Sequence, residues 1–342
     1  MPPRRTVTLQ DVAREAGVSV STASRTLNGR PAKVGIETQE RVRAIARRLG
    51  YATNLGAQAL VLGQSRAVGL IVGSVPEDYQ NPVLAGIFRA AARRDMVVTT
   101  AVSGISDVER TGQAVRQLRG QRPATVFVVG TEGPDAPGVR ELLEELAHVE
   151  SDGCRVVMIG IGGTPFDSVV VDDYQAGAVM AQTFFSLGYT DVSLLAGVGP
   201  GELSAQRTSG FIETMASLGT VIPPTQVLWQ EFSHDGGYRG AGELLRRRPR
   251  PQAIFCVNDA MAIGACVRLR EQGVRIGPEI AVAGCDDIPA LRDFDPPLTT
   301  MHLPWTEAAE HAFELASYER SAERAVVLKG HPVVRASTPE RG

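Results

Sequence analysis

Apolar residues recur at helical spacing in three short stretches near the N-terminus, Leu9–Ala16, Val20–Leu27 and Glu37–Leu49. Gly17-Val18-Ser19 separates the first two stretches, and Thr8 and Ser19 stand where they can cap the helices that follow them. Two helices joined by so tight a turn are typical of a helix-turn-helix, whose second helix can enter the major groove of DNA.

From Arg66 onward, short β-rich runs alternate with helical stretches. The strand-like runs are Val68–Val72, Val97–Val102, Thr125–Val129, Arg155–Ile159, Val169–Val171, Val192–Leu195, Ala253–Val257 and Ile280–Ala283. The helical stretches are Leu84–Arg94, Val108–Leu118, Val139–Val149, Gln175–Leu187, Ala205–Leu218, Gly236–Arg247 and Ala260–Gln272. This alternation predicts parallel sheets covered by helices on both faces, and about ten strands fit two lobes better than one sheet.

Charge is unevenly distributed along the chain. Residues 1–66 carry eleven Arg or Lys against four Asp or Glu, a net charge of +7, so the remaining residues carry −10. A basic segment on an acidic body indicates a polyanionic partner for that segment alone, although a merely soluble basic surface is the alternative.

Several protein classes are disfavoured by the sequence. It has no apolar run of about 18 residues and its first residues lack the apolar stretch of a secretory signal, so we expect a cytoplasmic protein with no membrane partner. The four cysteines and five histidines are scattered, which predicts neither a disulfide nor a metal site. No G-x-S-x-G or H-E-x-x-H motif occurs, so we expect no catalytic residue, no enzyme activity and no cofactor.

The segment from Val7 to Asn28 reads VTLQDVAREAGVSVSTASRTLN. It resembles the start of the lactose-repressor (LacI/GalR) family, V-T-L-x-D-V-A-x-x-A-G-V-S-x-x-T-V-S-R-x-L-N, and departs from it at Ala23. Further family motifs follow toward the C-terminus: R-x-x-G-F at Arg207–Phe211, A-x-N-D-x-x-A-x-G around Asn258, V-x-G-x-D-D around Asp286 and P-P-L-T-T at Pro296–Thr300.

The resemblance implies which residues of the first segment meet DNA. Val20 and Ser21 would occupy the main base-reading positions with Arg25 beside them, and Leu60 would wedge into the minor groove. The other residues expected to face DNA or cap helices are Thr8, Ser19, Thr22, Asn28, Asn54 and Ala57.

Two stretches depart from the family pattern. At the entry to the third helix, Gly35 replaces a capping serine and Gln39 replaces an arginine. In the linker, Thr53 replaces a proline and Gln58 an arginine. Each basic phosphate contact that is lost should lower affinity for DNA and flatten its salt dependence.

In doubly wound sheets, ligands bind beyond the carboxyl ends of the strands. The resemblance implies that Arg207, Asn258 and Asp286 face a ligand, with Phe232, Trp305 and Tyr79 as aromatic walls. A structural alternative is that Asp259 and Asp287 cap the helices that follow them, and that Asp172-Asp173 ends a strand at the lobe crossover. Gly160 stands where sugar-binding relatives often have an aspartate.

Together these observations predict an α/β chain: an N-terminal all-α helix-turn-helix domain plus a two-lobed, doubly wound, periplasmic-binding-protein-like sensor domain. The expected boundaries are 1–53 for the DNA-binding domain, 54–65 for a hinge helix or linker, and 66–342 for the effector-binding and dimerisation domain. Lobe one would span about 66–173 plus 304–326, and lobe two about 174–303 plus 327–342.

The expected function is that of a repressor whose binding to operator DNA is changed by a small effector. The expected partners are a pseudo-palindromic double-stranded operator, a carbohydrate effector and a second copy of the chain in a homodimer. The alternatives are a purine-type or other corepressor, or a solute-binding receptor without a DNA function.

Overall fold

The computed structural model describes residues 7–27, 34–52, 66–72, 80–102, 108–130, 135, 138–198, 203–317 and 323–341. These residues fall into two compact units, Met1–Ala67 and Val68–Gly342. The expected hinge at 54–65 lies outside the described residues.

In its described part, the first unit consists of three helices, α1 (Leu9–Glu15), α2 (Val20–Leu27) and α3 (Ile36–Leu49). Their bounds lie within one residue of the predicted stretches. The core they share is built of small side chains, Val12, Ala13, Ala16, Ala23, Val42 and Ala46. Small side chains let the three helices pack closely in a unit that has little apolar area to bury.

The turn between α1 and α2 depends on Gly17, whose φ of 63° lies in the left-handed region. A Cβ at Gly17 would meet nothing within 4 Å, so this glycine is required by its backbone angle and not by a close contact. Before α1, Thr8 and Asp11 form a capping box, with the Asp11 amide donating to Thr8 Oγ1 and the Thr8 amide donating to the Asp11 carboxylate.

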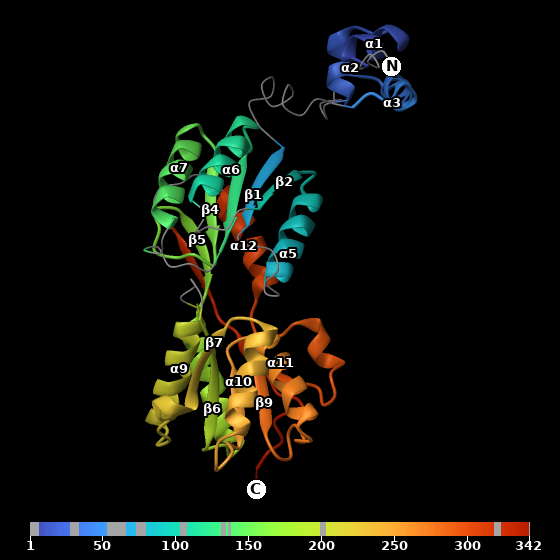
Figure 1. Ribbon diagram of the computed structural model, residues 1–342. Coiled ribbons are helices and arrows are strands. Elements are labelled where there is room, and N and C mark those ends of the chain that lie inside the picture. The colour runs from blue at the N-terminus through green and yellow to red at the C-terminus, as the bar shows by residue number, and fades with distance from the viewer. Residues whose placement is uncertain are drawn as a thin grey trace. The chain divides into compact units, whose positions relative to one another are not determined.

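The second unit is an α/β structure of two lobes, each with a six-stranded sheet in the part of the chain that is described (Figure 1). The first sheet has the order β11-β5-β4-β3-β1-β2 and the second has the order β12-β10-β9-β8-β6-β7. The strand pairs with a resolved register are parallel, except that β12 runs antiparallel to β10.

Lobe one contains β1 (Ala67–Val72), α5 (Gln80–Arg93), β2 (Val97–Val102), α6 (Val108–Gly120), β3 (Thr125–Val129), α7 (Val139–Ser151), β4 (Arg155–Ile159), β5 (Asp167–Val171), α12 (Trp305–Ser317) and β11 (Ala325–Leu328). Alternate residues of β3 face opposite cores: Phe127 and Val129 pack on the α5 and α12 side, and Val126 and Val128 on the α6 and α7 side. This two-sided burial explains why β3 is apolar from Val126 to Val129.

Lobe two contains α8 (Asp173–Ser186), β6 (Val192–Val198), α9 (Leu203–Ser217), β7 (Val227–Glu231), α10 (His234–Leu245), β8 (Ala253–Cys256), α11 (Asp259–Glu271), β9 (Ala281–Asp286), β10 (Thr299–His302) and β12 (His331–Val333). Short 3-10 turns lie at Pro224–Gln226 and Pro289–Arg292. Helix pairs α8 with α9 and α10 with α11 cover its sheet.

The described chain passes between the lobes at three places: after β5 at Asp172, between β10 and α12, and between β11 and β12. At the third crossing Gly330 lies against the carbonyl of His302, close enough that a Cβ there would meet that oxygen at 2.5 Å. Strand β11 extends to Leu328 in the sheet of lobe one, two residues beyond the expected end of that lobe at 326.

Candidate functional site

Exposed hydroxyl groups surround the N-terminus of α2, the helix predicted to read DNA. Ser19 caps it, since Ser19 Oγ accepts a hydrogen bond from the Thr22 amide at 3.1 Å. The same oxygen lies 2.9 Å from the hydroxyls of both Ser21 and Thr22. Beside them, Val20 is 44% exposed, although it is apolar. The helix therefore presents one methyl-bearing side chain and a set of short hydrogen-bonding groups, which suits contacts to base edges.

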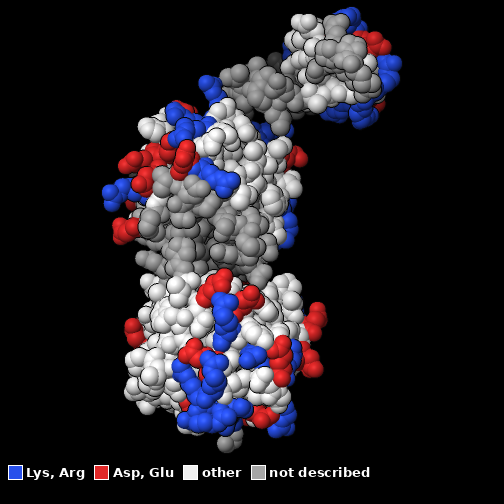
Figure 2. Space-filling view, in the orientation of Figure 1, with Lys and Arg blue, Asp and Glu red and all other residues white. Residues whose placement is uncertain are grey.

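Basic side chains are exposed on α2 and α3, and blue side chains stand at the edge of the helical unit in Figure 2. Arg25 is exposed near the end of α2, and Arg41, Arg43 and Arg47 are exposed on α3. Thr8, predicted at a backbone-contact position, is exposed, and its side chain takes part in the capping box. Asn28, Asn54, Ala57 and Leu60 lie outside the described residues.

The departure at the entry to α3 has a visible consequence. Gly35 is the N-cap of α3 and provides no side-chain hydrogen bond there. Gln39, which replaces the family arginine, donates from Nε2 to the carbonyl of Val34 at 2.7 Å. Gln39 thus takes part in the entry to α3, but it brings no charge that could meet a phosphate.

In lobe two, the guanidinium of Arg207 is held by residues from three elements. It comes from α9 and is 1% exposed. Its Nε donates to Asp173 at the start of α8 at 2.8 Å, and its Nη1 donates to the carbonyl of Val257 after β8 at 2.7 Å. Nη1 also forms an ion pair with Asp286 Oδ1 at the end of β9, at 3.2 Å. Two of the predicted ligand residues, Arg207 and Asp286, are therefore in contact, at the carboxyl end of a parallel strand.

Asp286 and Asp287 have positive φ values, 123° and 56°, which non-glycine residues rarely adopt. Asp259 helps to hold this turn, because its Oδ2 accepts from the Ile288 amide at 2.9 Å and its Oδ1 accepts from Thr300 Oγ1 at 2.6 Å. Strained backbone that the surroundings fix in this way is common at ligand sites.

Burial dominates the electrostatics of these acids. Desolvation raises the pKa of Asp286 well above its ordinary value, and Arg207 offsets only part of the effect. Desolvation likewise raises the pKa of Asp259 to about 7, against the hydrogen bonds from Thr300 and Ile288. The pKa of Asp173 is also raised by burial.

The capping roles expected in this region are partly wrong. Asn258, not Asp259, is the N-cap of α11, and its Oδ1 accepts from the Met261 amide at 2.8 Å. Asp287 instead pairs with Arg335 at 2.6 Å. Asn258 is a predicted ligand residue, and the cap leaves its side-chain amide group as the part that can donate elsewhere. Sequence reasoning also missed the contact of Asp173 with Arg207, since the Asp172-Asp173 pair was interpreted only as the end of a strand.

Two of the predicted aromatic side chains, Phe232 and Trp305, lie close to glycine residues. Phe232 follows β7 and packs on Gly197 of β6, where an added Cβ would overlap its ring. Trp305 begins α12 in lobe one and is 2% exposed. Gly160, after β4, has a φ of 84°, and a Cβ there would overlap the carbonyl of Gly130 and lie 4.0 Å from Trp305 Cη2. Tyr79 lies outside the described residues.

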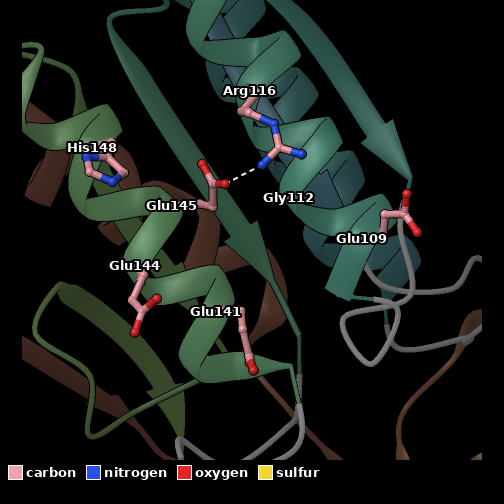
Figure 3. A pocket seen from close by; sticks show the side chains of 7 residues that line it. All are labelled: Glu109, Gly112, Arg116, Glu141, Glu144, Glu145 and His148. Atoms are coloured by element: carbon pink, nitrogen blue, oxygen red, sulfur yellow. Dashed lines mark hydrogen bonds and ion pairs between the residues drawn. The ribbon is translucent and has the colours of Figure 1, made fainter.

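A pocket of about 340 Å³ lies elsewhere, between α6 and α7 of lobe one, and holds none of the predicted ligand residues. Figure 3 shows Arg116 of α6 directed toward Glu145 of α7, with which it pairs. The other lining residues are Glu109, Gly112, Glu141, Glu144 and His148.

A helix-turn-helix unit and a two-lobed α/β domain with buried polar side chains at its strand ends define the class of DNA-binding regulators controlled by small molecules. The family described as bacterial regulatory proteins, lacI family, matches residues 8–54. A periplasmic binding protein-like domain matches residues 181–338. The chain thus combines a LacI-family helix-turn-helix domain with a periplasmic binding protein-like domain, and it is similar to LacI-family transcription regulators along most of its length.

Curated relatives agree with this assignment. The chain is 27% identical to the HTH-type transcriptional repressor PurR of Klebsiella pneumoniae over 90% of this chain and 89% of that protein. It is 28% identical to the PurR repressor of Pasteurella multocida over 98% and 99% of the two chains. These relatives are named as transcriptional repressors and not as enzymes.

Solved structures have the same architecture. A lac repressor dimer bound to operator and the anti-inducer ONPF aligns with a TM-score of 0.83 and 25% identity, covering 98% of this chain and 100% of that one. A complex of the regulator CelR with cellobiose aligns with a TM-score of 0.69 and 25% identity, covering 97% and 99%. None of the described helices of the present chain is long and apolar enough to cross a membrane.

Proposed function

We propose that this chain is a cytoplasmic repressor that binds a pseudo-palindromic operator as a homodimer. Its affinity for the operator would change when a small carbohydrate binds lobe two. The observation that carries the effector site is the contact between Arg207 and Asp286 at the end of β9. The solved relatives support the remaining parts, since one is a dimer on its operator and another holds cellobiose.

Each predicted group has a part in this proposal. Asp286 and the amide of Asn258 would hold the hydroxyls of the effector, and Arg207 would fix the position of Asp286. Phe232 and Trp305 would supply aromatic faces for the apolar side of a sugar ring. In the first unit, Val20 and Ser21 would read bases, and Arg25 would contact the phosphates or bases beside them.

A purine-type corepressor is the second candidate effector, and the similarity to repressors named PurR favours its inclusion in the test. A thermal-shift screen of the full chain against sugars and nucleosides should find the effector, because a ligand that binds only the folded state raises its stability. An operator-binding assay with each hit then gives the sign of the response, which we expect to be release of DNA by a sugar.

The decisive variant for the effector site is Asp286→Ala. It should weaken effector binding at least about 100-fold, because a buried charged hydrogen-bond partner is lost. The affinity for the operator in the absence of effector should stay nearly unchanged. Asp293→Ala, which removes an exposed carboxylate seven residues on, is the matched control. An Asp286→Ala protein that still responds at the wild-type effector concentration would disprove the site.

The DNA side is tested by replacing Val20 and Ser21 together and selecting on a randomised operator library. The preferred sequence should change, whereas Arg25→Ala should weaken binding to the operator. An unchanged preference after the double replacement would remove both residues from the base-reading role.

A further inference from the structure

Lobe two carries a dense run of arginines between α10 and β8. Four of the five residues at 246–250 are arginines, and we call this segment the arginine turn. It leads into the amino end of β8, so it lies at the opposite end of the sheet from Asp286, which stands at the carboxyl end of the parallel strand β9. In Figure 2, basic side chains gather on lobe two toward the end that lies away from lobe one. The arginine turn is therefore separate from the proposed effector site.

Local structure accounts for two of these arginines. Arg248 Nη1 donates to the carbonyls of Leu245 and Arg247, at 2.9 and 2.7 Å, and so satisfies carbonyls at the C-terminus of α10. Arg247 pairs with Glu243 at 3.3 Å and also donates to the carbonyl of Thr225. Both guanidinium groups are thus held in place by the protein.

Arg246 and Arg250 have no comparable contact. Both are exposed, and in the described part of the chain no hydrogen bond or ion pair of either guanidinium is found. The hydrogen bonds from Arg275 lower the pKa of Glu279, and the charge of Arg250 adds to this effect, but it is Arg275 that pairs with Glu279, at 2.9 Å. Two guanidinium groups without a counter-charge thus stand beside two that the protein holds.

Such a concentration of one charge is unfavourable by itself. A single exposed arginine is well solvated, but several within one turn repel one another, and an anion that meets them relieves the repulsion. The C-terminus of α10 explains one guanidinium of the turn and an ion pair explains another, so these structural roles do not account for the remaining two. A polyanion is the ligand that fits four cations in so short a segment.

We propose that the arginine turn binds the phosphate backbone of double-stranded DNA, as a second DNA contact in addition to that of the helix-turn-helix unit. Guanidinium groups match phosphates through paired N–H donors. An acidic protein is a poorer match, because protein interfaces have an apolar core, whereas the exposed residues of the turn are three arginines and Pro249. The inference goes beyond the proposed function, since phosphate contacts carry no base sequence and would let a protein bound to its operator hold another segment of DNA.

The experiment uses the full chain, loaded with enough unlabelled operator duplex to fill its helix-turn-helix units and no more, the operator being taken from selection on a randomised library. A trace of labelled duplex of about 20 base pairs without operator sequence is titrated with this complex at about 50 mM salt, and its binding is followed by fluorescence anisotropy. We expect the loaded wild-type protein to bind this second duplex, with an affinity that falls as the salt concentration rises. If selection yields no operator, sedimentation gives the number of duplexes of arbitrary sequence bound per chain at saturation, which should be higher for the wild type than for a variant of the turn.

The double variant Arg246→Ala with Arg250→Ala removes the two guanidinium groups that lack a protein partner. It should weaken binding of the second duplex about tenfold or more and reduce the slope of log affinity against log salt by about 2, while the affinity for the operator stays unchanged. Arg119→Ala with Arg239→Ala is the matched control, because both are exposed arginines that pair with carboxylates elsewhere in the two lobes. The control should leave binding of the second duplex nearly unchanged.

Three results would overturn the inference. The first is a loaded wild-type protein that binds no second duplex. The second is a second duplex that binds the variant of the arginine turn as tightly as the wild type, or an equal loss of binding in the control. The third is poly-L-glutamate of matched charge that binds the loaded protein more tightly than the duplex does, which would assign the arginine turn to an acidic protein instead.

Discussion

The two lobes have the same kind of sheet but present different chemistry at their strand ends. Lobe two gathers Arg207, Asp173 and Asp286 into a buried, paired network. Lobe one offers Gly160, whose backbone leaves no room for a side chain, against the ring of Trp305. Under the proposed function, lobe two would orient the polar groups of an effector and lobe one would cover it with backbone and an aromatic face.

The largest effect on stability is expected from removing the guanidinium of Arg207, the cation of the buried network in lobe two. Arg207→Met should lower the free energy of unfolding by about 3–5 kcal/mol, because Asp173 and Asp286 would remain buried without their counter-charge. Arg119→Met, which removes an exposed pair with Asp152, should cost much less. Denaturant unfolding of both variants measures the two changes. Similar losses of unfolding free energy would show that the buried network contributes no more to stability than an exposed ion pair.

A second effect concerns pH. Burial raises the pKa of Asp259 from 3.8 to about 7, so the folded chain holds a proton that the unfolded chain has released. The free energy of unfolding should therefore fall as the pH rises from about 4 to 7, by about 4 kcal/mol from this group, and level off above.

Asp259→Asn has no proton to release in that window. The difference in unfolding free energy between variant and wild type should thus rise with pH in favour of the variant. Urea titrations at several pH values measure it, and a difference that stays constant from pH 4 to 7 would show that Asp259 is ionised throughout.

A smaller effect is expected in lobe one. Gly160→Ala should cost about 2–3 kcal/mol, since the new Cβ combines an unfavourable φ with an overlap on the Gly130 carbonyl. Gly153→Ala is the matched control in the same lobe, because its φ is 88° but its surroundings are open, and it should cost about 1 kcal/mol. Equal costs in thermal unfolding would mean that the backbone relaxes at residue 160.

Most of the fold was predictable because most elements are long and strongly patterned. The strands β1, β3 and β4 are apolar apart from the first residue of β3 and of β4, and the helices of the first unit have clear breakers between them. Four strands were missed: β7, β10, β11 and β12. Each is an edge strand, half-exposed or only three or four residues long, so its pattern is too short to show a period. Helix α12 was also missed, although Ala308, Ala309, Ala312 and Phe313 have helical spacing.

The sequence pointed to residues of the candidate site but not to their contacts. The family motifs pointed to Arg207 and Asp286, and the fold brings them together. Nothing local in the sequence shows that Asp173 reaches Arg207, because that contact depends on how α8 and α9 pack. The absence of a side chain at position 160 was visible in the sequence, but its reason, the position of the Gly130 carbonyl, comes from tertiary structure.

The return of the chain to lobe one has a consequence for the order in which the protein is made. Strand β5 pairs on its outer side with β11, and α12 packs on β4 and β5, so the edge and one face of the first sheet depend on residues after 304. A ribosome must deliver most of lobe two, from α8 to β10, before it delivers those pieces. Lobe one begins first but is completed only after most of lobe two has been made, and until then it carries an open strand edge that can pair with other chains.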